Sequence, residues 1–358
     1  MGRIYIDDTT LRDGEQTPGL FITKKNKIKI AKHLDKLGVD EIEAGFPASG
    51  KMAKESFAAL MELNLKARLI AWNRATIEDI KSSLDVGASS VEISLPVSDI
   101  QIKNKLNKDK RWILDELKRV LDFCKDKGLY VSVGGEDSSR ADMSFLLQFV
   151  ITAEKHGADR FRFCDTVGVL NPFTAFENVK FLKENTNLPI EIHFHNDLGM
   201  ATANSLAAIK AGAEYVNTTF MGLGERAGNV PLEEMIMVLK MSDTYETGCH
   251  IHLLSDTLKD IAKILNIKIP FNKPVIGRNV FRHESGIHVD GVLKAPENYE
   301  PFPPEIIGRK RSITFGNSSG RAALVYILKK WGINIKKETL NADLLEFARK
   351  CISVKRYL

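Results

Sequence analysis

Two histidines separated by a single residue are the clearest candidates for chemistry in this chain. His193 and His195 lie in a short run of β-forming residues, and alternate residues of a strand project from the same face. Two imidazoles on one face could share a divalent metal ion. A carboxylate from another strand, such as Asp13, would complete the ligand set and leave positions open for substrate. The alternative is a chance pair of core histidines, but polar residues at most of the remaining predicted strand ends favour a site.

An arginine directly precedes the candidate ligand Asp13. Arg12 would be buried where the strands end, and a buried guanidinium needs a carboxylate partner, which Glu43 on the adjacent strand could supply. This pair could be structural. It could equally act in catalysis, because an arginine held beside a metal ion can stabilise a developing alkoxide.

Two segments in the last quarter of the chain are also candidates. The stretch 283–291 holds two of the eight histidines, His283 and His288, together with two acids and two glycines. Histidine is the commonest acid–base residue near neutral pH, so this stretch is either catalytic or a surface turn. The stretch 316–321 opens a predicted helix. It could bind an anion through backbone N–H groups, although Ser and Gly are also ordinary at helix starts.

The elements that carry these residues follow one repeating order, in which short β-rich runs alternate with amphipathic helical patterns. The predicted strands are Ile4–Asp7, Glu41–Phe46, Ala67–Trp72, Ser90–Leu95, Tyr130–Val133, Arg160–Cys164, Ile190–His195 and Tyr215–Thr219. The predicted helices are Lys24–Leu37, Lys51–Leu63, Ile77–Leu84, Arg111–Lys127, Met143–Lys155, Phe173–Glu184, Ala201–Lys210 and Leu232–Met241. Such alternation implies parallel strands joined by right-handed crossovers.

Eight such units predict an α/β fold in which residues 1–245 form a closed (β/α)8 TIM barrel. A doubly wound open sheet is the alternative, but no Gly-x-Gly-x-x-Gly motif follows a strand. Residues 246–358 are predicted to form a mostly helical extension, with helices at 250–266, 321–332 and 338–350 and a Pro- and Gly-rich stretch at 267–320. We expect this extension to pack on the barrel or on a second subunit.

Composition narrows the function classes. With 358 residues, 44% hydrophobic and 27% charged, the chain is not globally disordered, and its net charge of +5 suits small anionic substrates. The lysines are scattered, so no nucleic-acid binding is expected. Four cysteines without a Cys-x-x-Cys pair indicate neither a zinc knuckle nor a disulfide framework. Without a signal-peptide pattern or an apolar run of membrane-spanning length, we expect a soluble cytoplasmic protein that binds no membrane.

Four motifs, in order along nearly the whole chain, make it resemble the metal-dependent Claisen-condensing synthases, which form homocitrate, 2-isopropylmalate and citramalate. The motifs are Leu11–Gln16 followed by Lys27, His193–Gly199, Gly224–Asn229 and Ser285–His288. Within that family the chain is most similar to the nitrogen-fixation type of homocitrate synthase, at 71–74, 131–140 and 283–291.

The resemblance implies one divalent cation (Mg²⁺, Mn²⁺ or Zn²⁺), with Asp13, His193 and His195 as ligands and Asn229 as a fourth contact. It implies acetyl-CoA as co-substrate and a 2-oxo acid as acceptor. Arg12 and Glu136 match catalytic residues, and so does His288, which the family delivers from the partner subunit of a homodimer. The predicted substrate-binding residues are Gln16, Glu43, Arg74, Arg162 and Thr166.

The predicted reaction is condensation of acetyl-CoA with 2-oxoglutarate to give homocitrate and CoA. The lysine-pathway members carry an arginine four residues before Glu136, whereas this chain has Ser132. Arg74 or Arg162 would then have to hold the distal carboxylate. Alternatives are 2-isopropylmalate or citramalate synthase, and less favoured ones are an acyl-CoA lyase or aldolase on the same barrel or a non-enzymatic scaffold. A leucine-sensing domain is not expected.

Overall fold

A computed structural model describes residues 2–355, which divide into two compact units. The first unit comprises residues up to 250 together with 260–267. The second comprises 251–259 and the residues from 268 onwards. Over the described part of the chain, no helix is both long enough and apolar enough to cross a membrane.

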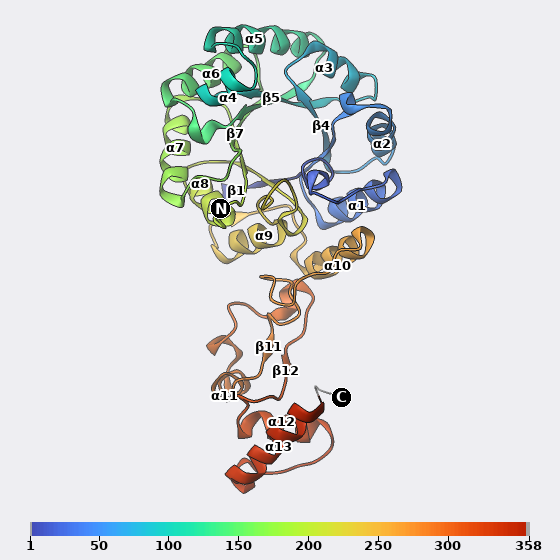
Figure 1. The fold of residues 1–358 in the computed structure, drawn as a ribbon, viewed down its shortest axis with the longest axis vertical. Coiled ribbons are helices and arrows are strands. Elements are labelled where there is room, and N and C mark those ends of the chain that lie inside the picture. The colour runs from blue at the N-terminus through green and yellow to red at the C-terminus, as the bar shows by residue number, and fades with distance from the viewer. Residues whose placement is uncertain (1, 356–358) are drawn as a thin grey trace. The chain divides into compact units, whose positions relative to one another are not determined.

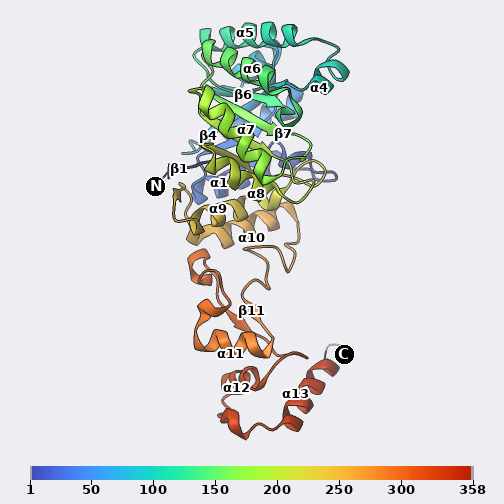
Figure 2. The same cartoon turned by 90° about the vertical axis from the view of Figure 1, so that its left-hand side faces the viewer.

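Eight parallel strands of the first unit close into a barrel inside a ring of helices (Figures 1 and 2). The barrel strands are β2 (Tyr5–Asp8), β3 (Glu41–Gly45), β4 (Arg68–Arg74), β5 (Ser90–Pro96), β6 (Tyr130–Glu136), β7 (Arg160–Asp165), β8 (Ile190–Phe194) and β9 (Tyr215–Thr218). The helices are α1 (Lys24–Leu37), α2 (Lys51–Met61), α3 (Ile77–Leu84), α4 (Asp99–Asn104), α5 (Lys110–Asp126), α6 (Met143–Lys155), α7 (Pro172–Asn185), α8 (Ala201–Lys210) and α9 (Leu232–Met241). Each strand pairs with its neighbours in sequence and β9 closes on β2, so the predicted TIM barrel is confirmed.

Local sequence signals set the ends of the barrel helices. The side chains of Thr23, Asp109 and Asp142 each accept a hydrogen bond from a backbone N–H in the first turn of α1, α5 or α6. These contacts satisfy donors that have no partner within the helix. Helix α1 ends at Gly38, whose φ of 90° lies in the left-handed region that glycine adopts without strain. The glycine that ends α1 lets the chain turn directly into β3.

The barrel interior is charged, because strand alternation directs two arginines inward. Phe161 of β7 packs against Phe149 of α6, so its neighbours Arg160 and Arg162 face the barrel axis. Both arginines are almost completely buried. They form ion pairs with a group of equally buried carboxylates from the surrounding strands: Asp7, Glu41, Glu43 and Glu191. This interior ion-pair network lies beneath the polar strand ends.

Short elements complete the chain. Strand β1 (Gly2–Arg3) pairs in parallel with β10 (Tyr245–Glu246), and α10 (Leu254–Leu265) contributes residues to both units. The 3₁₀ helices are Gly14–Gln16, Pro47–Ser49, Ser138–Arg140, Phe220–Gly222, Ile251–Leu253, Pro296–Asn298, Pro304–Ile307 and Lys337–Thr339.

The second unit contains β11 (Arg282–His283), α11 (Gly286–Lys294), β12 (Ser312–Ile313), α12 (Arg321–Lys330) and α13 (Ala342–Lys355). Its core is an apolar cluster of Val289, Ile313, Phe315, Ala323, Leu324 and Leu340. The predicted helices at 250–266, 321–332 and 338–350 correspond to α10, α12 and α13. Helix α11 lies inside the stretch 267–320, where the sequence predicted no helix. Its two glycines, Gly286 and Gly291, weaken the helical pattern there.

Candidate active site

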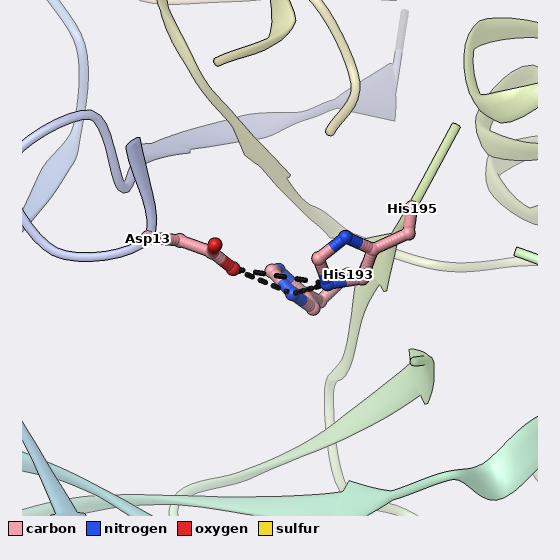
Figure 3. Close-up of side chains that lie close together, drawn as sticks. All are labelled: Asp13, His193 and His195. Carbon is pink, nitrogen blue, oxygen red and sulfur yellow. Dashed lines mark hydrogen bonds and ion pairs between the residues drawn. The ribbon is translucent and has the colours of Figure 1, made fainter. Parts of the chain in front are cut away.

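Three buried ligand groups converge at the carboxyl end of the barrel (Figure 3). Asp13 lies in the loop after β2, His193 is within β8 and His195 follows that strand. Asp13 Oδ2 lies 3.2 Å from His193 Nε2 and 3.8 Å from His195 Nε2. The two Nε2 atoms are 3.3 Å apart. The predicted set of one carboxylate and two imidazoles is thus assembled in one place, as a divalent cation requires.

A neighbouring asparagine orients the first histidine. His193 Nδ1 lies 2.7 Å from Asn217 Oδ1, and Asn217 Nδ2 donates to Asp7 Oδ2 at 2.9 Å. Since an amide oxygen can only accept, Nδ1 of His193 donates to Asn217, and Nε2 is the ring nitrogen directed at the site. The sequence analysis missed Asn217. Its position on β9, facing inward beside His193, was the available signal.

The protonation states and unpaired atoms at this site suit the binding of a metal ion. Burial opposes ionisation of Asp13, but Arg12 and then His193 and His195 outweigh it and hold the pKa of Asp13 well below its usual range. Burial and the neighbouring His193 lower the pKa of His195 to about 4, so its imidazole is neutral near pH 7. Asp13 Oδ1 and His195 Nδ1 are buried without a hydrogen-bond partner. An ionised carboxylate, the neutral imidazole of His195 and an unsatisfied carboxylate oxygen fit a divalent cation.

The fourth predicted contact, Asn229, lies beside these groups. It is 1% exposed, its Oδ1 has no hydrogen-bond partner, and its Nδ2 donates to the carbonyl of Leu223 at 3.0 Å. Gly224 makes room for it, because a Cβ at Gly224 would lie 2.1 Å from Asn229 Nδ2 and 3.2 Å from Asp13 Oδ1. A glycine is therefore required between these two side chains.

Arg12 is held as the sequence analysis predicted. Its Nε and Nη2 lie 2.8 Å from Glu43 Oε2, and its Nη1 lies 3.3 Å from Asp13 Oδ2. Its guanidinium carbon lies 5.6 Å from the ring centre of Trp72. Burial opposes ionisation of Glu43, but Arg12 and Arg162 outweigh it and hold the pKa of Glu43 below its usual range. The arrangement fixes a cation beside the candidate metal ligands.

A pocket of about 270 Å³ opens over this group. Its lining residues are Arg12, Asp13, Gln16, Trp72, Glu92, Ser94, Lys105, Glu136, Arg162, Cys164, Thr166, His193, His195, Glu225 and Arg226. Eight of the twelve predicted site residues therefore meet at one pocket. Glu43 supports Arg12 from below, and Asn229 lies behind Gly224.

The two arginines predicted to hold a distal carboxylate lie in different surroundings. Arg162 lines the pocket, but it is 1% exposed and its guanidinium lies between Asp7, Glu43 and Glu191 in the interior network. The side chain of Arg74 is 63% exposed and pairs with Asp79 outside the pocket lining. The two terminal nitrogens of Arg162 are paired in the interior network, and its Nε, 3.7 Å from Glu92 Oε1, has no hydrogen-bond partner.

Glu92 was missed by the sequence analysis and lies in the pocket wall. Its Oε1 is 3.7 Å from Arg162 Nε, and its Oε2 is buried without a partner. Burial raises the pKa of Glu92 to about 7, against the attraction of Arg162 and with further repulsion from Glu191 and Glu43. Gly134 on the next strand leaves space for this side chain, because a Cβ there would lie 2.3 Å from Glu92 Oε1.

Glu136 and Thr166 lie at the ends of adjacent strands. Glu136 Oε1 and Oε2 accept hydrogen bonds from Lys105 Nζ at 2.6 and 2.7 Å. Thr166 Oγ1 accepts a hydrogen bond from the backbone N–H of Asp137 at 2.8 Å, which leaves its own proton to donate into the pocket.

His288 belongs to the second unit, so this arrangement does not test its predicted role at the barrel site. It lies on the exposed side of α11, where its ring stacks on that of Tyr299 at a centroid distance of 4.2 Å and an angle of 18°. Gly291, one turn further on, makes room for the Tyr299 ring, because a Cβ there would lie 2.4 Å from it.

Both parts of the chain match known protein families, and the whole chain is similar to several named enzymes. The HMGL-like family model covers residues 3–264, and the model for the homocitrate synthase post-HMGL domain covers 275–351. Homocitrate synthase 1 of a Nostoc species is 48% identical over 100% of this chain and 95% of its own length. 2-Isopropylmalate synthase 2 of Caldanaerobacter subterraneus is 46% identical over 99% and 92%. (R)-Citramalate synthase of Methanocaldococcus jannaschii is 43% identical over 94% and 69%.

Solved structures agree on the fold. The HMG-CoA lyase of Bacillus subtilis matches 75% of this chain and 96% of its own with a TM-score of 0.67 at 19% identity. That identity supports the barrel alone. The sequence relatives are more specific, and the chain belongs to the HMGL-like family, in the branch that contains the homocitrate, 2-isopropylmalate and citramalate synthases.

Proposed function

We propose that this protein is an acyltransferase that condenses acetyl-CoA with a 2-oxo acid and releases CoA, with a divalent cation at Asp13, His193 and His195. The observation that carries the proposal is the convergence of these three ligands with Arg12 in one polar pocket. The similarity to enzymes named as synthases of homocitrate, 2-isopropylmalate and citramalate supports the same reaction class.

Each group in the pocket has a task in such a reaction. A bound divalent cation would make the keto carbon a better electrophile. Arg12, fixed by Glu43, is placed to stabilise the alkoxide charge that develops on the keto oxygen. Thr166 has a proton to donate to the acceptor's carboxylate. Holding both substrates in one pocket removes much of the entropic barrier to a bimolecular step.

Proton removal from the acetyl methyl group needs a base. Glu136 lines the pocket and is the candidate within the first unit. We infer that His288 is a second catalytic group and that it completes the site of a partner subunit in a homodimer. Its exposed position on α11, stacked against Tyr299, leaves the imidazole accessible to another chain.

We propose 2-oxoglutarate as the acceptor and homocitrate as the product. An isopropyl group is recognised by apolar side chains, whereas most side chains that line the pocket are charged or polar, with Trp72 and Cys164 as exceptions. This lining favours an acceptor that carries a second charged group over 2-oxoisovalerate. Pyruvate remains the alternative acceptor, because its methyl group makes little demand on the pocket.

Release of the CoA thiol from acetyl-CoA tests the proposal. The full chain would be assayed with Mg²⁺ or Mn²⁺ against 2-oxoglutarate, 2-oxoisovalerate, pyruvate and oxaloacetate. We expect release with 2-oxoglutarate, its loss on chelation and recovery when metal is restored. Asp13→Ala should abolish it, and Asp256→Ala, at an exposed site on α10, should not. Release with a different acid would change the acceptor, and the absence of release with all four would overturn the reaction class.

A further inference from the structure

Four cationic side chains line the pocket, and three of them are held by other groups of the protein. Arg12 lies between Glu43 and Asp13 next to the metal ligands. Arg162 is 1% exposed and is enclosed by three carboxylates of the interior network; its one donor without a hydrogen bond, Nε, lies 3.7 Å from a fourth carboxylate, that of Glu92. Arg226 bonds both oxygens of Asp197 and donates to the carbonyl of Thr166. The fourth is Lys105.

Lys105 has one partner, and that partner is a candidate catalytic carboxylate. Its Nζ lies 2.6 and 2.7 Å from the two oxygens of Glu136, while its side chain is 52% exposed and lines the pocket. An ammonium group has three donors, and Glu136 occupies two of them. One N–H of Lys105 is therefore available to a second anion without loss of the first contact.

The segment that carries Lys105 is fixed to the same strand end. Lys105 terminates α4, whose first turn is capped by Ser98. Ser98 also donates to the carboxylate of Asp137, the residue after Glu136, at 2.5 Å. Ile102 on the inner side of α4 is 3% exposed. The ammonium group is thus held over the pocket by a short, anchored helix.

We propose that Lys105 binds the distal carboxylate of a dicarboxylic 2-oxo acid, with Glu136 orienting its ammonium group. This inference rests on the proposed condensation and names the residue that selects its acceptor. Ser132, at the position where the family resemblance predicts an arginine, is fully buried and uncharged, and its hydroxyl lies 3.4 Å from Glu191 Oε2. Lys105, directly after α4, supplies a cation from a different element.

The test compares acceptors with and without a distal carboxylate. In Lys105→Met we expect the KM for 2-oxoglutarate to rise more than about tenfold, roughly 1.4 kcal/mol of binding free energy. For pyruvate, the fold increase in KM should be less than a third of that for 2-oxoglutarate. Lys105→Arg should restore most of the discrimination because it keeps the cation. Lys103→Met, at an exposed residue of the same helix, is the matched control.

Calorimetric titration of 2-oxoglutarate and of pyruvate into the wild type and Lys105→Met, with Mg²⁺ present, gives the same answer without turnover. Selective loss of 2-oxoglutarate binding supports the inference even if no CoA is released, in which case only the condensation is wrong. Equal weakening of both acids would show that Lys105 acts only through Glu136, and no weakening would show that it binds neither. Either result overturns the inference. So would a selective loss of 2-oxoglutarate binding in Arg226→Met that is absent from Lys105→Met.

Discussion

Asn217 illustrates how one amide can set the chemistry of a ligand that it neighbours. Its Oδ1 lies 2.7 Å from His193 Nδ1, and its Nδ2 donates to Asp7, so the amide cannot flip without losing both contacts. We expect Asn217→Ala to weaken Mn²⁺ binding by about 10- to 100-fold, because His193 loses the contact that fixes its tautomer.

The affinity can be measured by following free Mn²⁺ with electron paramagnetic resonance. Asn204→Ala is the matched control, since Asn204 is equally buried but donates to the carbonyl of Leu170 away from the ligands. An unchanged Mn²⁺ affinity in Asn217→Ala would show that strand β8 alone fixes the ring of His193.

At Gly224, a single added methyl group would disturb the candidate metal site. A methyl group there would approach Asn229 Nδ2 to 2.1 Å and Asp13 Oδ1 to 3.2 Å. We expect Gly224→Ala to lose most metal-dependent activity while the barrel stays folded, as judged by circular dichroism. Gly87→Ala separates backbone strain from crowding, because Gly87 has a φ of 80° and no atom within 4 Å of the added Cβ. Equal damage from both substitutions would contradict this explanation.

Glu92 links the pocket to the pH dependence of stability. Its raised pKa, about 7, means that the folded protein holds this proton more tightly than the unfolded chain, whose glutamates titrate near 4.5. The stability that this group contributes is therefore complete at low pH and is lost as the pH rises through about 7. Arg162 of β7, Glu191 of β8 and Glu43 of β3 face it inside the barrel.

Glutamine resembles the protonated form of glutamate, so Glu92→Gln should reduce the loss of stability as the pH rises. We expect the variant to match the wild type at pH 5 and to exceed it by about 1–3 kcal/mol at pH 8 in the free energy of unfolding. Urea titrations at the two pH values measure the difference. A variant that is less stable at pH 8 would show that Glu92 is ionised and supports Arg162.

At the scale of elements, the interior ion-pair network is the feature that departs most from an apolar barrel core. Arg160 is fully buried and pairs with Glu41 and with Glu191 Oε2, the latter at 2.8 Å. We expect Arg160→Met to destabilise the protein by about 3–5 kcal/mol, because removing one partner leaves buried carboxylates without their counter-charge. Chemical denaturation measures the loss. Arg119→Met on exposed α5, where the pair with Glu116 is at the surface, should cost less than about 1 kcal/mol.

Elements with long apolar periodicity were predictable, and short polar ones were not. The eight strands and the eight helices that follow them were located within a few residues, because the helices bury one face and the strands are short, almost fully buried β-forming runs. Helix α4 has six residues, and α11 contains two glycines, so neither shows a helical pattern. The convergence of the candidate metal ligands could be predicted, because spacing on one strand fixes which way His193 and His195 point. The contacts of Glu92 and Lys105 could not, because they depend on which strands and loops face one another in the barrel.

At the scale of the whole molecule, the groups proposed for catalysis come from different units of the chain. Asp13 lies in the first unit and His288 in the second. If a site takes Asp13 from one subunit and His288 from its partner, then a mixed dimer of Asp13→Ala and His288→Ala chains contains one intact site. Each pure variant contains none.

Random reassembly of the two variants should therefore recover about one quarter of the wild-type activity, because half of the dimers are mixed and each has one working site of two. CoA thiol release measures the recovery, and co-expression with two different affinity tags isolates the mixed dimers. Mixing Asp13→Ala with His193→Ala is the control, since both residues belong to one barrel and each site then lacks a ligand in every pairing. If the mixed dimers stay inactive, His288 acts on its own chain and the site is complete within one subunit. Full activity in the pure His288→Ala dimers would show instead that His288 has no catalytic role.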